Sequence, residues 1–171
     1  MSDVIEMETV KRYEVFIRKT DQHPIYQHER DVINPEIFYD FLIRRVGLDE
    51  KPQENFVVMA IDYSHRIKGY AIVAIGDYTN AVLSPSNIFQ FAMSVGANAV
   101  ILAHNHPSGS PEPSKNDISA TEAFIEGGRI LGIPVLDHLI LTDSIYYSMA
   151  EECNEVIFNV EGDPNKNVVQ G

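Results

Sequence analysis

Two short apolar runs constrain the fold of this chain more than any other feature of the sequence. Residues 56–61 and 98–103 are almost continuously apolar, so neither run shows the alternation that is typical of a strand with one face in water. A strand of this kind needs cover on both faces. Segments with helical spacing separate the two runs, and the sequence therefore predicts an α/β fold in which helices cover both faces of a sheet.

Three segments carry helix start and stop signals, namely a capping residue or Pro at the beginning and Gly at the end. Four further segments have the composition of strands. One of them, 67–75, joins 56–61 in a hairpin that turns at Ser64-His65-Arg66. The predicted helices run from Asn34-Pro35 to Gly47, from Ser84-Pro85 to Gly96 and from Ser114 to Gly132. The further predicted strands are 67–75, 133–141, 146–149 and, near the N-terminus, 13–18.

The length of 171 residues, 44% of them apolar, suits a single domain with a short extension. A polar connector that contains Pro52 divides the chain at about residue 50. We interpret residues 1–50 as an N-terminal extension made of one strand and one helix. Residues 51–159 form the domain, and residues 160–171 are a frayed tail.

Charge and cysteine content exclude several functions. Thirteen Lys and Arg stand against 25 Asp and Glu, which gives a net charge of −12 and argues against nucleic acid as a partner. Neither a secretory signal nor a run long enough to span a bilayer is present, so we expect a cytoplasmic protein without membrane contact. The single cysteine, Cys153, leaves His and carboxylate side chains as the ligands for any metal.

Such a ligand set follows the second apolar run. His104 and His106 lie two residues apart, so in an extended chain their side chains point to the same side. Ser114 and Asp117 follow after a loop rich in Pro and Gly. Three nitrogen or oxygen ligands leave zinc a fourth position for water, and zinc lowers the pKa of that water from 15.7 to roughly 7. The spacing is therefore typical of a hydrolytic zinc site.

A structural interpretation competes for the last two of these residues. Ser114 and Asp117 match the Ser-x-x-acid pattern of a helix N-terminus, in which the hydroxyl binds backbone and the carboxylate complements the helix dipole. Capping does not explain two imidazoles at the mouth of a buried strand, because such groups are costly to bury. The residues alone leave both interpretations open.

The motif and its flanks resemble the JAMM metalloprotease motif, His-x-His-Pro followed by Ser-x-x-Asp, in the form found in bacterial RadC-like proteins. The resemblance covers about residues 54–150 and implies the JAB/MPN fold, a mixed sheet flanked by helices that is similar to cytidine deaminases. The matching segments are His104-Asn105-His106-Pro107-Ser108-Gly109, Pro113-Ser114, Asp117-Ile118, and the flanks 98–103, 128–133 and 136–140.

Carried over residue by residue, the resemblance makes His104, His106 and Asp117 the ligands of Zn²⁺. It makes Ser114 the hydroxyl that steadies the tetrahedral intermediate. Glu54 becomes the general acid and base, although its own spacing is that of an ordinary loop glutamate.

Two positions qualify the resemblance. Asn105 replaces the Ser or Thr of eukaryotic deubiquitinating members, which places the chain on the bacterial branch. The pair Asp137-His138 also matches that branch, and we interpret His138 as a structural histidine, with a fourth metal ligand as the alternative. Residues 1–50 show neither the length nor the glycine-marked hairpins of the helix-hairpin-helix region that full-length members carry.

The function implied is a zinc-dependent metallopeptidase or isopeptidase that acts on a peptide or protein substrate. In that mechanism Glu54 takes a proton from zinc-bound water and passes it to the leaving amine. One alternative is a zinc-containing domain that binds a partner protein without catalysis. Another is a metal-dependent nuclease, suggested by the string His104-Asn105-His106 and by the family's DNA association, although nucleases named for that triad disperse it over a ββα unit.

Overall fold

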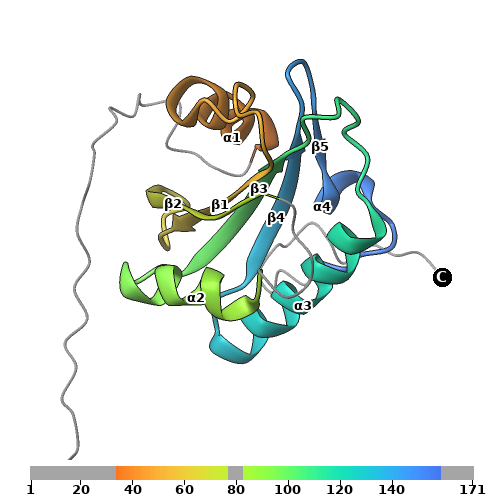
Figure 1. Ribbon diagram of the computed structural model, residues 1–171. Helices are drawn as coiled ribbons and strands as arrows, with labels where there is room; N and C mark the ends of the chain where they lie inside the picture. Colours follow the sequence, from red (N-terminus) through yellow and green to blue (C-terminus); the bar gives the residue numbers. More distant parts are fainter. Residues whose placement is uncertain (1–33, 77–82, 159–171) are drawn as a thin grey trace, which may run out of the picture.

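The computed structural model describes residues 34–76 and 83–158, and it has a five-stranded sheet in the order β2-β1-β3-β4-β5 (Figure 1). Its strands are β1 (Asn55–Ile61), β2 (Ile67–Ile75), β3 (Ala99–Asn105), β4 (Val135–Leu141) and β5 (Tyr146–Ser148). Its helices are α1 (Pro35–Phe41), the π-helical η2 (Leu42–Val46), α2 (Pro85–Ser94), α3 (Lys115–Leu131) and α4 (Met149–Glu152). None of these helices is long and apolar enough to cross a membrane.

The sheet is mixed, because β3 and β4 run parallel while the other neighbouring strands run antiparallel. Helix α1 covers one face, and α2 and α3 cover the other (Figure 1). Side chains of β1 alternate between the two cores: Val58 packs toward α2 and α3, whereas Val57 and Met59 pack toward α1. The predicted α/β sheet with both faces covered is confirmed.

The first helix begins and ends where the sequence places it. Asn34 accepts a hydrogen bond from the Glu36 N–H at 2.9 Å, and Gly47 takes the left-handed conformation at φ 61°. The last turn, η2, is wider than an α-helix, which the apolar spacing does not reveal. Leu42 and Leu48 are both fully buried around this wide turn.

Helix α1 contributes to one of the two cores, the one on its own face of the sheet. Phe38 and Phe41 are each only 2% exposed, and they pack in one cluster with side chains of β1, β3 and β4. The helix that we assigned to the extension therefore shares its apolar contacts with the sheet. The strand predicted at 13–18 and the tail at 160–171 lie outside the described residues.

The end of the sheet differs from the prediction by one short helix. The sequence predicts a strand over 146–149, but β5 ends at Ser148 and α4 begins at Met149. The Ser148 hydroxyl accepts a hydrogen bond from the Glu151 N–H at 3.2 Å and so caps this helix. Ser148 and Glu151 form the Ser-x-x-Glu pattern of a capping box, which is the signal that could have located α4.

Substitution of Gly128 tests the packing of α3 on α2. A Cβ at this position would lie 2.5 Å from the Ile133 carbonyl oxygen and 3.2 Å from the ring of Phe89. Gly128→Ala gains about 1 kcal/mol of helix propensity, but a clash with backbone costs more. We expect the free energy of unfolding in urea to fall by about 1–3 kcal/mol. The control is Gly69→Ala, whose Cβ meets nothing within 4 Å, and equal stability of the two variants would contradict this packing.

Candidate metal centre

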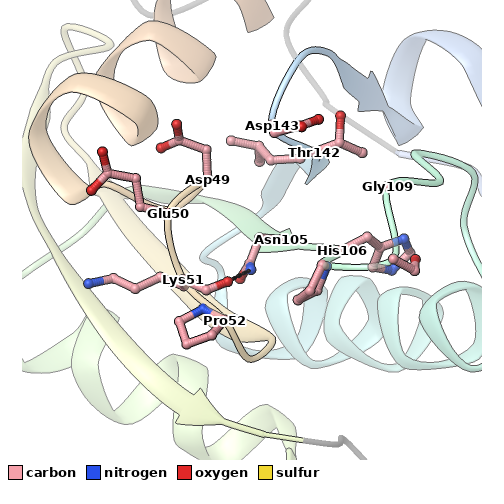
Figure 2. A pocket seen from close by; sticks show the side chains of 12 residues that line it. Asp49, Glu50, Lys51, Pro52, Asn105, His106, Gly109, Thr142 and Asp143 are labelled. Carbon is pink, nitrogen blue, oxygen red and sulfur yellow. Dashed lines mark hydrogen bonds between the residues drawn. The ribbon is translucent and has the colours of Figure 1, made fainter.

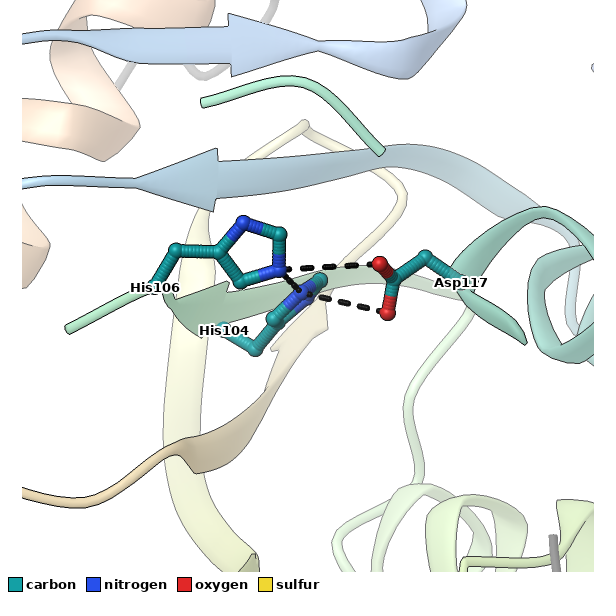
Figure 3. A group of neighbouring side chains, drawn as sticks. All are labelled: His104, His106 and Asp117. Atoms are coloured by element: carbon teal, nitrogen blue, oxygen red, sulfur yellow. Dashed lines mark hydrogen bonds and ion pairs between the residues drawn. The ribbon is translucent and has the colours of Figure 1, made fainter. Parts of the chain in front are cut away.

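The centre lies where β3 leaves the sheet. His104 is the penultimate residue of β3 and His106 follows its end. Along β3 the even-numbered side chains Val100 and Leu102 face α2 and α3, so His104 continues the row on that face. The N–H of His106 still donates to the Leu141 carbonyl of β4 at 2.7 Å, which keeps the chain extended. Both imidazoles therefore approach the start of α3 (Figure 3).

Helix α3 brings Asp117 to the two histidines. Ser114 is its N-cap, and its hydroxyl accepts from the Asp117 N–H at 3.2 Å. In return, Oδ2 of Asp117 accepts from the N–H of Ser114 at 2.7 Å and from its hydroxyl at 2.5 Å. The capping interpretation is therefore correct, and it is compatible with a metal site because the cap fixes Asp117 in the first turn.

The three side chains meet closely enough to share one cation. Their candidate ligand atoms all lie within 4.8 Å of one another. Nε2 of His104 is 2.9 Å from Nε2 of His106 and 3.3 Å from Oδ1 of Asp117, and Nε2 of His106 is 3.5 Å from Oδ2. Ligands at about 2.0–2.1 Å from a tetrahedral ion lie about 3.3 Å apart. The donor set and its spacing thus fit a tetrahedral metal with one position left over.

Burial and mutual contact set the proton affinities of the three groups. Burial lowers the pKa of His104 to about 4, against the opposing charge of Asp117. Burial also lowers the pKa of His106, but hydrogen bonds with Asp117 and with the Ser110 carbonyl outweigh it and leave that pKa raised. Burial raises the pKa of Asp117, whereas hydrogen bonds from His106 and Ser114 hold it well below its usual range. The site therefore offers an ionised carboxylate and an uncharged imidazole.

Nδ1 of each imidazole, the nitrogen opposite the candidate metal position, also has a hydrogen-bond partner. Nδ1 of His106 donates to the Ser110 carbonyl at 2.7 Å. Nδ1 of His104 lies 2.8 Å from Nε2 of His138, and Nδ1 of His138 lies 2.6 Å from the hydroxyl of Thr121. His138 is fully buried, and it stands behind a ligand instead of joining the three-residue group. The contact between His138 and His104, and the part of Thr121 in it, were not foreseen from the sequence.

Asn105 points away from the histidines and holds the loop before β1. Its Oδ1 accepts from the Asn55 N–H at 2.8 Å, and its Nδ2 donates to the carbonyls of Gln53 at 3.0 Å and Lys51 at 3.1 Å. These bonds bracket Glu54 on both sides. The sequence motif alone does not reveal this structural role of Asn105.

Glu54 lies beside the centre without belonging to the three-residue group. Glu54 precedes β1. Phe56 of β1 pairs with His104 of β3 in antiparallel register, so continuing this register by two residues brings Glu54 to the level of His106. Glu54 is half-buried, and its charge contributes to the raised pKa of His106. Its carboxylate therefore acts on the centre through space.

A cavity of about 590 Å³ borders the centre (Figure 2). Its volume falls in the range of small-molecule sites. His106 and Asn105 form one part of the wall, and Asp49, Glu50 and Asp143 contribute carboxylates elsewhere in the lining. A ligand in this cavity would contact the candidate centre through His106.

Comparisons with known proteins agree with this geometry. Residues 32–154 match the family model of the RadC-like JAB domain. A UPF0758 protein of Carboxydothermus hydrogenoformans is 43% identical over 126 residues, which make up 74% of this chain and 55% of that protein. A UPF0758 protein of Methanosarcina acetivorans is 33% identical over 145 residues, or 85% of this chain and 59% of that protein. This chain thus spans less than two thirds of the length of either relative.

The family model covers α1, the whole sheet and each of the three candidate ligands. The mixed sheet and the position of the centre at the end of β3 agree with the JAB/MPN fold that the sequence motif implied. By this match and by the two relatives, the chain belongs to the RadC-like JAB-domain family.

Proposed function

We propose that this protein is a zinc-dependent hydrolase that cleaves an amide bond in a peptide or protein. The observation that carries the proposal is the convergence of His104, His106 and Asp117 with ligand atoms within 4.8 Å. Two imidazoles and one carboxylate are a donor set that zinc prefers, and three protein ligands are typical of catalytic rather than structural zinc sites.

Bound in this group, zinc would act as a Lewis acid and would bring the pKa of a coordinated water close to neutrality. The residues of the chain supply the proton transfers. The carboxylate of Glu54 accepts a proton from the attacking water and returns it to the leaving amine. The bonds of Asn105 on either side of Glu54 keep the backbone of this residue in place during both transfers.

We assign two roles to Ser114. Its hydroxyl and N–H both hold Oδ2 of Asp117, which orients the carboxylate toward the histidines. With substrate bound, the hydroxyl would turn its single proton from Oδ2, which the N–H of Ser114 still holds, to the oxyanion that develops on the substrate carbonyl. The cavity next to His106 would receive part of the substrate.

Metal analysis with ligand variants is the first test. We expect close to one zinc per chain in the purified protein and a sharp loss of zinc in His104→Ala and in Asp117→Ala. The matched control is His65→Asn, because His65 is exposed and sits in a turn at φ 55°, a conformation that Asn tolerates. Full zinc retention in both ligand variants would refute the site.

Glu54→Gln separates binding from turnover. The amide keeps the size of the side chain but cannot take a proton, so zinc content should stay at the wild-type level. Turnover in a peptide-library cleavage assay should fall by about 10²–10⁴-fold. A wild-type protein that binds zinc but cleaves no peptide, with partner binding unaffected by Glu54→Gln, would support a non-catalytic domain instead.

Asn105→Ala tests the hydrogen bonds that hold the loop on which Glu54 lies. Asn105→Ala leaves the buried N–H of Asn55 unsatisfied, and we expect the free energy of unfolding to fall by about 1–3 kcal/mol. Asn105→Asp should not rescue the loss, because a carboxylate oxygen would face the carbonyls of Lys51 and Gln53. Urea denaturation measures the loss, with Asn116→Ala on the exposed surface as the control. Wild-type stability in Asn105→Asp would contradict the assignment.

Metal removal should lower thermal stability, since an ion that binds only the folded protein stabilises it. Free zinc at 100 times its dissociation constant contributes about 2.7 kcal/mol. We expect chelation to lower the Tm of the wild type and to leave His104→Ala unchanged. Calorimetry measures both, and an equal shift in the two proteins would show that the ion acts elsewhere.

A further inference from the structure

We propose that His138 and Thr121 are positioning residues that fix the tautomer of His104, so that its Nε2 meets the metal without a proton. This inference rests on the metal site of the proposed function, but it does not depend on which bond the protein cleaves. A neutral imidazole carries one proton on one of two nitrogens, and only the nitrogen without a proton can bind a metal. The partners behind His104 decide which nitrogen that is.

The argument starts at Thr121, which has a single hydroxyl proton. Its Oγ1 donates to the backbone carbonyl of Asp117 at 2.6 Å, and the sulfur of Met149 lies at 3.5 Å as a weaker acceptor for the same proton. Neither of these two partners can donate to the hydroxyl. The proton of Thr121 therefore points away from His138, and Oγ1 is left to accept.

The next hydrogen bond must run from His138 to Thr121. Because Oγ1 accepts, the proton of the neutral His138 ring lies on Nδ1, which is 2.6 Å from Oγ1. Nε2 of His138 then carries a lone pair. This lone pair lies 2.8 Å from Nδ1 of His104, and it can only be satisfied if His104 donates. His104 is therefore protonated on Nδ1, and its Nε2 points into the three-residue group with a free lone pair.

The relay also links two of the three candidate ligands. It begins at the backbone carbonyl of Asp117 in α3, passes through Thr121 and His138, and ends at His104 in β3. Thr121, His138 and His104 are each no more than 1% exposed. Water cannot replace any of these bonds. The donor-to-acceptor direction that is set at Thr121 is therefore kept in the hydrogen bond between His138 and His104.

His106 shows the same outcome by a simpler route. Its Nδ1 donates to the backbone carbonyl of Ser110 at 2.7 Å, and a carbonyl can only accept. Nε2 of His106 is therefore also free of a proton in the neutral ring. Nδ1 of His104 instead faces Nε2 of His138, and the buried pair His138 and Thr121 supplies the acceptor.

The test removes the directing proton acceptor without removing volume. In Thr121→Val the hydroxyl is lost, and His138 can move its proton to Nε2 and donate to His104, which would then carry its own proton on the metal-facing nitrogen. We expect Zn²⁺ affinity, measured by competition with a chromophoric chelator, to fall about 10–100-fold. Thr121→Ser keeps the hydroxyl and should restore an affinity near the wild-type value.

The matched control is Thr142→Val, a buried threonine in the cavity wall that hydrogen-bonds in the turn before β5 and forms no hydrogen bond to a relay residue within the described part of the chain. Its Zn²⁺ affinity should equal that of the wild type even if its stability falls. Equal affinity in Thr121→Val and in Thr142→Val would overturn the proposal. So would an affinity of Thr121→Ser as low as that of Thr121→Val.

A second measurement needs no variant. In the zinc-loaded wild type, ¹⁵N-histidine NMR should show His138 with its proton on Nδ1 and an unprotonated Nε2. A His138 ring protonated on Nε2 would refute the relay even if Thr121→Val fails to fold. None of these readouts uses catalysis, so an absence of peptide cleavage would overturn the proposed function while the positioning role stands or falls on its own data.

Discussion

The pleat of β3 is the constraint on which the centre depends. Successive side chains of a strand point to opposite faces, so His104 and His106 reach the start of α3 while Asn105, between them, reaches the loop before β1. One three-residue stretch thereby contributes two candidate metal ligands on one face and holds the neighbours of Glu54 from the other. A one-residue slip in the pairing of β3 would exchange these two faces, and the apolar rows packed against α1 and α2 prevent it.

The cap of α3 supplies the remaining candidate ligand, Asp117. Asp117 is fixed by the N–H and the hydroxyl of Ser114, which satisfy one of its oxygens and leave Oδ1 toward His104. Asp117 serves both as a capping partner at the helix end and as a candidate carboxylate ligand for a cation. This dual use explains why the sequence pattern supported two interpretations at once.

Most of the sheet and its cover could be predicted because apolar periodicity and end signals are local. Only a few neighbouring residues are needed to recognise the apolar run at 56–61, the end of the first helix at Gly47 and the helix cap at Ser114. The candidate metal ligands can be recognised from their spacing and from the family resemblance. The wide turn of η2 has no local signal.

The hydrogen bonds from Asn55 to Asn105, between His104 and His138, and between Thr121 and His138 join residues at least 17 positions apart in sequence. Such contacts become readable only when β1, β3, β4 and α3 are placed together. The cavity beside His106 depends on loops before β1 and after β4, which are also distant in the chain. The residues that support the site were therefore harder to find than the candidate ligands themselves.

The hydrogen bonds behind the candidate ligands have an entropic consequence. His104, His106 and Asp117 are each held by a partner outside their own group, namely His138, Ser110 and Ser114. Ordering a free side chain costs up to about 2 kcal/mol, and here the rotamers are already fixed when the chain folds. An arriving ion would find its ligands in place, so affinity depends on coordination and on the dehydration of the ion, with little loss of side-chain freedom.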